Sequence, residues 1–186
     1  MTNQEMKLQK MERSCDVTKK VLAIFRIIFI VFAALFFIVG GVLFGMQKTL
    51  DPVIEEAVEN ETVTFHFTEL EIGGTLTFTA SFEKMLDNGQ YSVAFGIFSM
   101  IAVVVLVLII VVMSLFIKIF ALIKENGTPF CEEVTEKLKG GFIFTAIVIF
   151  FVSGIGTGLV MSLVFWCIYW IFEYGSVLQT ESDETL

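Results

Sequence analysis

Polar side chains able to carry out chemistry are scarce in this sequence. It contains a single histidine and three cysteines, and none falls in the paired spacings that hold zinc. No aspartate or glutamate interrupts the long apolar runs, which argues against an intramembrane aspartyl protease and against a carboxylate proton relay. The one glycine-rich stretch, residues 154–158, lacks the lysine that a phosphate-binding loop needs. We therefore expect no metal, no cofactor and no enzymatic activity.

Hydrophobic residues make up 56% of the 186 residues, more than the 45–50% usual for a soluble domain. They are concentrated in three blocks, residues 21–44, 93–123 and 140–172. A membrane-spanning helix needs about 20 apolar residues, so each block is a candidate. The third block is too long for one span and short for two. Its centre holds three glycines within residues 154–158, a pattern typical of a tight turn.

These patterns predict an all-α membrane protein with four transmembrane helices and a small extracellular β-hairpin between helices one and two. A three-span protein with its tail outside is the rival interpretation. The predicted segments are an N-terminal segment (1–20), the first helix (21–45), an acidic outer segment (46–91), the second helix with a cytoplasmic extension (92–124), a loop (125–139), the third helix (140–154), the fourth helix (158–174) and an acidic tail (175–186).

Basic residues are distributed unevenly along the chain and indicate its orientation. Residues 1–20 hold five lysines and arginines and residues 118–139 hold four, whereas residues 46–91 hold two against nine acids. Because cytoplasmic segments are enriched in lysine and arginine, both termini are predicted to be cytoplasmic and residues 46–91 extracellular. The first apolar block is longer than a signal-peptide core, so it is expected to remain as an anchor in the plasma membrane.

The outer segment contains two alternating stretches that are typical of strands. Residues 62–67 and 75–82 alternate apolar and polar side chains. A turn at residues 73–75 and a bulge at residues 68–69 would bring all apolar side chains onto one face, with Phe65 opposite Phe82. An isolated hairpin is only marginally stable. A short helix over residues 51–58, the membrane surface or a second protomer would have to cover it.

Aromatic and basic side chains mark the expected membrane interface. Both tryptophans and two of the three tyrosines fall within nine residues near the end of the fourth helix, as in an interfacial aromatic belt. The one charge in the first helix lies about 9 Å past Lys20, close enough for its side chain to reach the headgroups. The expected interface residues are Arg26, Trp166, Tyr169, Trp170 and Tyr174.

Two further segments are not explained by membrane residence alone: the Gly-Thr-Pro-Phe loop after the second helix, and the tail with its Phe-x-x-Gly-x-x-Leu-Gln pattern followed by acids and a final leucine. In these two segments the chain resembles the YoaS-like family of uncharacterised four-helix membrane proteins of Gram-positive bacteria. The resemblance implies a fold and a location more than an activity. It also implies a cytoplasmic helix-turn-helix regulator as a partner, because such genes commonly neighbour those of the family. The residues that carry it are Gly127, Thr128, Pro129, Phe130, Phe172, Gly175, Leu178, Gln179, Asp183 and Leu186.

The helix ends predict that this loop and the tail meet. We expect the third helix to start at residues 128–129, with Thr128 as its cap. Gly175 is expected to end the fourth helix in a left-handed conformation. Leu178 would then fold back beside Phe130, and Gln179 would meet the free amides at the start of the third helix.

The leading hypothesis is a non-enzymatic membrane protein of regulatory or interaction type. A small transporter, channel or immunity-type protein is the alternative. Its partners would be the lipid bilayer, a helix-turn-helix regulator and a second copy of the chain, with no direct binding of nucleic acid. The candidate interaction residues are Gly127, Thr128, Pro129, Phe130, Gly175, Leu178 and Gln179.

Overall fold

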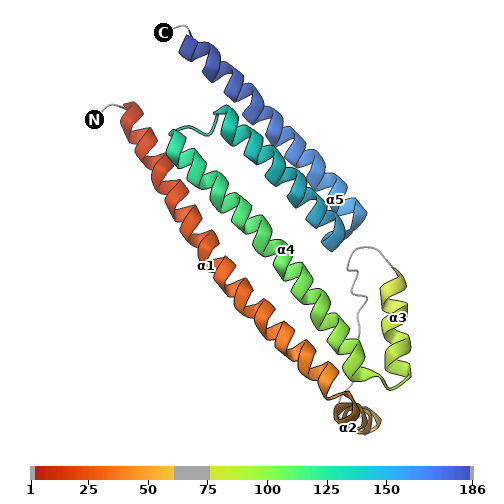
Figure 1. The fold of residues 1–186 in the computed structure, drawn as a ribbon. Coiled ribbons are helices and arrows are strands. Elements are labelled where there is room, and N and C mark those ends of the chain that lie inside the picture. Colours follow the sequence, from red (N-terminus) through yellow and green to blue (C-terminus); the bar gives the residue numbers. More distant parts are fainter. Residues whose placement is uncertain (1–2, 61–75, 185–186) are drawn as a thin grey trace.

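The computed structural model describes residues 3–60 and 76–184 and places them almost entirely in helices, with no strand in these ranges. Three of the helices are long and apolar enough to cross a membrane, which is consistent with an all-α membrane protein. Figure 1 shows them packed side by side as a bundle. The helices are α1 (Asn3–Gly45), α2 (Gln47–Glu59), α3 (Leu76–Asp87), α4 (Tyr91–Asn126) and α5 (Glu132–Glu184).

Of the contacts between separate helices, that between α1 and α4 is the most extensive, and the two helices run antiparallel (Figure 1). Small residues allow their backbones to approach closely. A Cβ atom on Gly40 would lie 3.3 Å from the Cβ of Ser99, and one on Gly96 would lie 3.0 Å from the Phe44 ring. The Ser99 hydroxyl also donates a hydrogen bond of 2.9 Å to the carbonyl of Phe36. Small residues and hydroxyl hydrogen bonds are the usual means of joining helices in a membrane.

Helix α5 is a helical hairpin rather than one straight helix. Its backbone leaves the helical region at Gly154, where φ is 87° and ψ is 172°, a region that is essentially restricted to glycine. The two arms then run back along each other (Figure 1). The turn takes fewer residues than the predicted range 154–158, because helical structure resumes directly after Gly154.

Gly158 holds the two arms of α5 together just after the turn. A Cβ atom at this position would lie 2.6 Å from Cδ2 and 2.8 Å from Cα of Phe150. The arms therefore touch backbone to backbone at this point. Farther from the turn, the Phe142 and Phe165 rings stack with centroids 4.9 Å apart.

The main buried cluster lies at the end of the bundle that carries Asp16 and Lys124, called the Lys124 end below. It joins α1, α4 and the first arm of α5, and Val134 at its centre is fully buried. The N-terminal segment is thus a packed continuation of α1, since Cys15 belongs to the cluster. The buried members are Cys15, Ile119, Ile123, Val134, Leu138 and Phe142.

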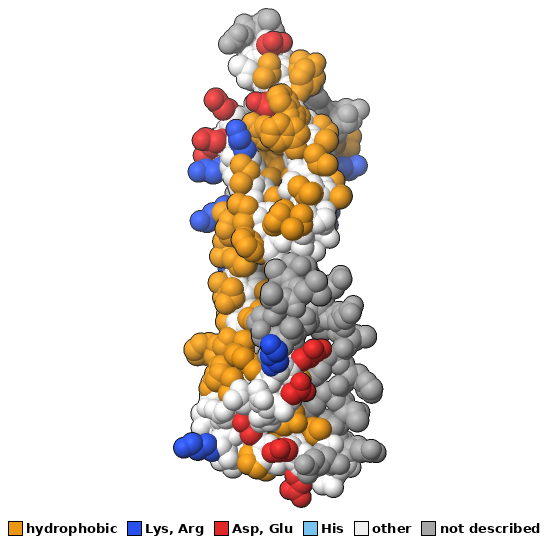
Figure 2. Space-filling model, turned by 90° about the vertical axis from the view of Figure 1, so that its right-hand side faces the viewer, with side chains coloured by type: hydrophobic (Ala, Val, Ile, Leu, Met, Phe, Trp, Pro, Cys, Tyr) orange, Lys and Arg blue, Asp and Glu red, His pale blue; other side chains and the backbone are white. Residues whose placement is uncertain are grey.

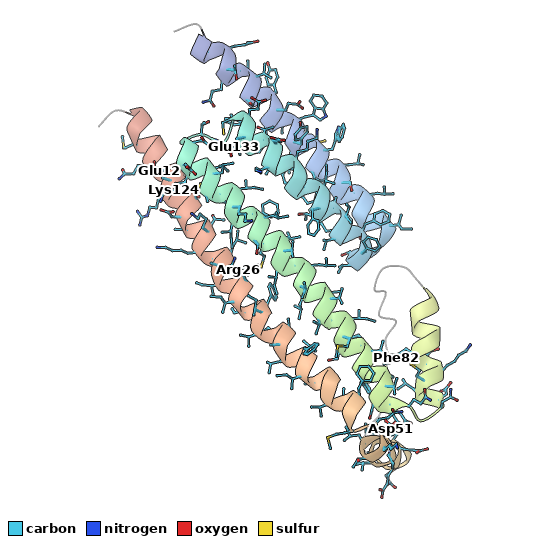
Figure 3. The ribbon with its side chains drawn as sticks, viewed as in Figure 1. Glu12, Arg26, Asp51, Phe82, Lys124 and Glu133 are labelled. Atoms are coloured by element: carbon cyan, nitrogen blue, oxygen red, sulfur yellow. The ribbon has the colours of Figure 1, made fainter. Side chains whose placement is uncertain are left out.

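The opposite end, called the Asp51 end, is closed by α2. Helix α2 includes all of the short helix predicted over residues 51–58. The carboxylate of Asp51 accepts a hydrogen bond of 2.7 Å from the backbone N–H of Ser92 in the first turn of α4. An acid at a helix N-terminus satisfies a free amide and complements the helix dipole, so α2 caps α4. Figure 3 shows Asp51 and Phe82 at this end and Lys124 at the other.

The predicted second strand of the hairpin, residues 75–82, is wrong for the described residues, because Leu76–Asp87 is helix α3. Apolar residues here also repeat with a helical period, at positions 78, 82, 85 and 86. The Phe82 ring meets the edge of Phe95 on α4, with centroids 6.0 Å apart. The segment therefore forms a helix whose apolar face packs on α4, although its sequence also alternates as a strand would. The predicted first strand (62–67), the bulge at 68–69 and the turn at 73–75 lie outside the described residues.

One ion pair links α1 to α4 at the Lys124 end. The ammonium Nζ of Lys124 lies 2.6 Å from Oδ2 of Asp16 (Figure 3 labels Lys124). This hydrogen bond lowers the pKa of the Asp16 carboxyl and raises the pKa of Lys124. The pair therefore stabilises the fold above the acidic range in which Asp16 is protonated, and that contribution is lost as pH falls through the lowered pKa.

Replacing Lys124 with methionine is expected to raise the pKa of Asp16 towards its ordinary value, because its hydrogen-bonding cation is removed. The change in stability should be small, since both side chains are about 40% exposed. Carboxyl-carbon NMR titration of the protein in detergent measures the pKa. A Lys20→Met control should change it less, because Lys20 acts only through a weaker coulombic contribution. An Asp16 pKa that is the same in all three proteins would contradict the pairing.

Candidate interaction site

The Gly-Thr-Pro-Phe loop begins where α4 ends. Gly127 takes the left-handed conformation, with φ 65° and ψ 4°, as a helix-terminating glycine does. The next hydroxyl then organises the loop in two ways. Thr128 Oγ1 accepts a hydrogen bond of 3.2 Å from the backbone N–H of Phe130 and donates one of 2.7 Å to Oε1 of Gln179. The loop is thereby tied to the last part of α5, 51 residues away in sequence.

Phe130 forms the apolar half of the same junction. Its ring lies 5.6 Å, centroid to centroid, from the Phe172 ring. It also lies against the backbone of Gly175, where a Cβ atom would come within 2.5 Å of Cδ1 of Phe130. Because Phe172 and Gly175 are three residues apart on one helix, they present the same face. The ring therefore fills a notch that exists only because residue 175 has no side chain.

The structure thus brings Thr128, Phe130, Gly175 and Gln179 together. We call these residues and Phe172 the loop–tail junction. Pro129 lies between the two contacting loop residues and is half-buried. Phe172 belonged to the sequence pattern but was not among the candidate interaction residues. Its spacing from Gly175 was the signal that could have identified it as a partner of Phe130.

Several details of the predicted junction are wrong. Gly175 does not end the helix, because α5 continues to Glu184. As a result Leu178 does not fold back beside Phe130, and its side chain is 47% exposed. The helix after the loop begins at Glu132 rather than at residues 128–129. Gln179 accordingly meets the Thr128 hydroxyl instead of free backbone amides.

The end of α5 presents an apolar stripe next to the junction. Tyr174, Val177 and Leu178 are 66%, 51% and 47% exposed. Their spacing of three and four residues places them on one side of the helix. Figure 1 shows that the last part of α5 extends past the end of α4, so neighbouring helices leave the stripe uncovered. The junction fixes the end of α5 against the loop, and the stripe stays exposed.

The predicted interface residues on α5 gather at the Lys124 end of its second arm. Trp166 and Trp170 meet edge to face at 6.2 Å, and Tyr169 lies 6.4 Å from Trp170. The ammonium Nζ of Lys139, on the first arm, lies 5.4 Å from the centre of the Tyr169 ring, within cation–π range. Arg26, on α1, is partly exposed. Hydrophobic side chains cover much of this face of α5 (Figure 2).

Within the described ranges, no group of three or more His, Cys, Asp or Glu side chains is arranged to hold a metal ion. Comparison of the chain with protein-family models, with curated proteins and with solved structures finds no match.

Proposed function

We propose that this protein is a non-enzymatic membrane protein of regulatory or interaction type, and that the end of α5 binds its cytoplasmic partner. The observation that carries the proposal is the loop–tail junction. Thr128 and Phe130 fasten the last turns of α5 to the preceding loop, while Tyr174 and Leu178 stay exposed. A rigid helix that presents an apolar stripe is a common mode of recognition.

In the topology behind this proposal α1 and α4 cross the membrane, and the two arms of α5 lie within it. Both termini and the junction lie on the cytoplasmic side of the plasma membrane. The excess of basic residues in residues 1–20 and 118–139 supports this orientation. The opposite end, with α2 and α3, then faces outward.

The partner is a protein with an apolar groove and basic surroundings. The apolar groove would accept Tyr174, Val177 and Leu178. Basic side chains would complement the acids of the tail, which the sequence places at positions 181, 183 and 184. The resemblance of the loop and tail to the YoaS-like family points to a short helix-turn-helix regulator as this partner.

A Tyr174→Ser, Leu178→Ser double variant should lose at least about ten-fold in partner recovery, because truncating two central contacts typically costs more than about 1.4 kcal/mol of binding free energy. The fold should be unaffected, since both side chains are exposed. The measurement is quantitative cross-linking and co-purification of the full chain from native membranes. Thr180→Ala, a nearby exposed change, is the matched control. Equal recovery with all three proteins would exclude the stripe as the binding surface.

A further inference from the structure

The α5 hairpin reaches only to the middle of α4. A Cβ atom on Gly141 would lie 3.1 Å from Cδ1 of Ile119, which sets the register of the first arm against α4. The two run antiparallel (Figure 1), so the turn at Gly154 lies level with about Leu106 of α4. From there α4 continues for about 22 Å to Tyr91 at 1.5 Å per residue. Figure 1 likewise shows the turn beside the middle of α4.

The first arm is also too short to cross a bilayer. Its uncharged part, residues 140–153, is 14 residues long and measures about 21 Å. The hydrocarbon core is about 30 Å thick, and apolar stretches of 10–14 residues are typical of re-entrant segments. Gly154, the one non-helical residue, is buried. This burial matters because irregular backbone within a membrane must be shielded from lipid.

A groove runs along the outer side of this hairpin, between its arms. It has a volume of about 590 Å³ and is lined mainly by apolar and aromatic side chains. Phe150 and Phe151 lie at the end near the turn, and Lys139 and Glu173 lie at the other. From Lys139 to Phe151 the helix rises about 18 Å, close to the roughly 15 Å of half a hydrocarbon core. The groove therefore has the length of an acyl chain in one leaflet.

The end of the groove away from the turn carries one basic and one acidic side chain, which together suit a zwitterionic lipid head group. Lys139 supplies an ammonium group above Tyr169, suited to a phosphate oxygen. Glu173 supplies a carboxylate in the same lining, which disfavours a purely anionic head and favours one with an amine. Trp166 and Trp170 also line this end, and such side chains favour the headgroup level.

We propose that α5 enters the bilayer from the cytoplasmic side as a re-entrant hairpin that does not reach the opposite face, and that its outer groove binds one phospholipid of the cytoplasmic leaflet whose head carries a phosphate and a primary ammonium group. The phosphate meets Lys139, the ammonium group meets Glu173, and one acyl chain follows the groove towards Phe150. The naming of the leaflet uses the topology proposed above, but the site does not depend on any cytoplasmic partner.

The chain carries its own reporter of this site, because its two tryptophans both line the groove. The full protein is reconstituted in phosphocholine vesicles that contain increasing fractions of phosphoethanolamine lipid with brominated acyl chains, and tryptophan quenching is measured. We expect phosphoethanolamine lipid to bind about five-fold more tightly than brominated phosphocholine lipid, because its primary ammonium can donate a hydrogen bond to Glu173 that a trimethylammonium cannot, and such a bond contributes about 1 kcal/mol. Lys139→Met should weaken the binding of both lipids, because both carry the phosphate, and Glu173→Gln should remove this preference. Lys118→Met, which changes a lysine outside the groove lining, should retain it.

Two results would overturn the lipid site. Equal quenching by both headgroups would mean that the groove holds only surrounding lipid without recognition. Quenching that falls as protein density rises, together with cross-links between copies through Ile143→Cys, would mean that a second copy fills it. An Ala146→Phe variant provides a second measure, because filling the groove should reduce quenching even with Lys139 present.

The depth of the hairpin is tested separately at Thr157, which lies just past the turn and is exposed. In full-length protein with its three cysteines replaced by alanine, Thr157→Cys should resist a membrane-impermeant maleimide both in intact cells and in inside-out membrane vesicles. Labelling from outside would show that the arms cross the bilayer and would refute the re-entrant arrangement. Neither result bears on partner binding at Tyr174 and Leu178, so the two proposals fail independently.

Discussion

Replacing Gly158 with leucine is expected to part the two arms of α5 and to destabilise the protein by about 3 kcal/mol, the upper end of the usual cost of overpacking. A Cβ atom at this position would lie 2.8 Å from Cα of Phe150 and 2.6 Å from its Cδ2. A side-chain atom could rotate away, but the backbone atom can move only with its helix. The clash must therefore separate the arms and disturb the Phe142–Phe165 stack beyond them.

Gly156→Leu is the matched control for this change. It lies on the same arm two residues earlier, and a Cβ atom there meets nothing within 4 Å. Since leucine has a higher helix propensity than glycine, this variant should be neutral or slightly more stable. Thermal unfolding in detergent, followed by tryptophan fluorescence, compares the two. If both leucine variants melt at the same temperature, the close approach of the arms at Gly158 is wrong.

Replacing Gly175 with leucine is expected to displace the Phe130 ring and to cost about 2 kcal/mol. The new Cβ atom would come within 2.5 Å of Cδ1 of Phe130. Here the obstacle is a side chain, which can swing out, so the cost is smaller than at Gly158 and consists mainly of lost packing against Phe172. The Thr128–Gln179 hydrogen bond should weaken at the same time, because it belongs to the same junction.

A second substitution tests the contact between Phe130 and Gly175 directly. Phe130→Ala removes the ring that the leucine would strike, so the double variant should be more stable than the sum of the two single effects predicts, by about 1 kcal/mol or more. Gly140→Leu is the control, since a Cβ atom at that helical glycine meets nothing within 4 Å. Melting temperatures of the four proteins complete the cycle. Strictly additive effects would show that Phe130 and Gly175 are not in contact.

The sequence of the α3 region fits two kinds of secondary structure. Residues 76–82 satisfy a period of two, and residues 78–86 also satisfy a helical period. Periodicity over so few residues cannot separate a strand from a helix. The Phe82–Phe95 contact with α4 is a tertiary interaction, and no local signal in the segment announces it.

For the tail, the sequence predicts the residues that meet the loop but not the geometry of their contact. Loop and tail are predicted to meet because two helical arms joined by a tight turn bring their far ends together, and the two segments do meet at Thr128 and Gln179. A glycine near a helix end predicts that the helix stops there, but Gly175 is helical and leaves room for the Phe130 ring. Glycine suits both roles, and only the neighbouring loop decides between them.

The sequence by itself determined the long apolar helices and the break at Gly154. Each of these depends on the residue's own chemistry: the transfer of apolar side chains out of water, and the access of glycine to positive φ. The tertiary structure alone decided the register of the helices. That register packs Gly158 on Phe150 and sets the α5 turn beside the middle of α4. Register depends on the fit between side chains far apart in the chain, and this fit exists only once the helices have packed together.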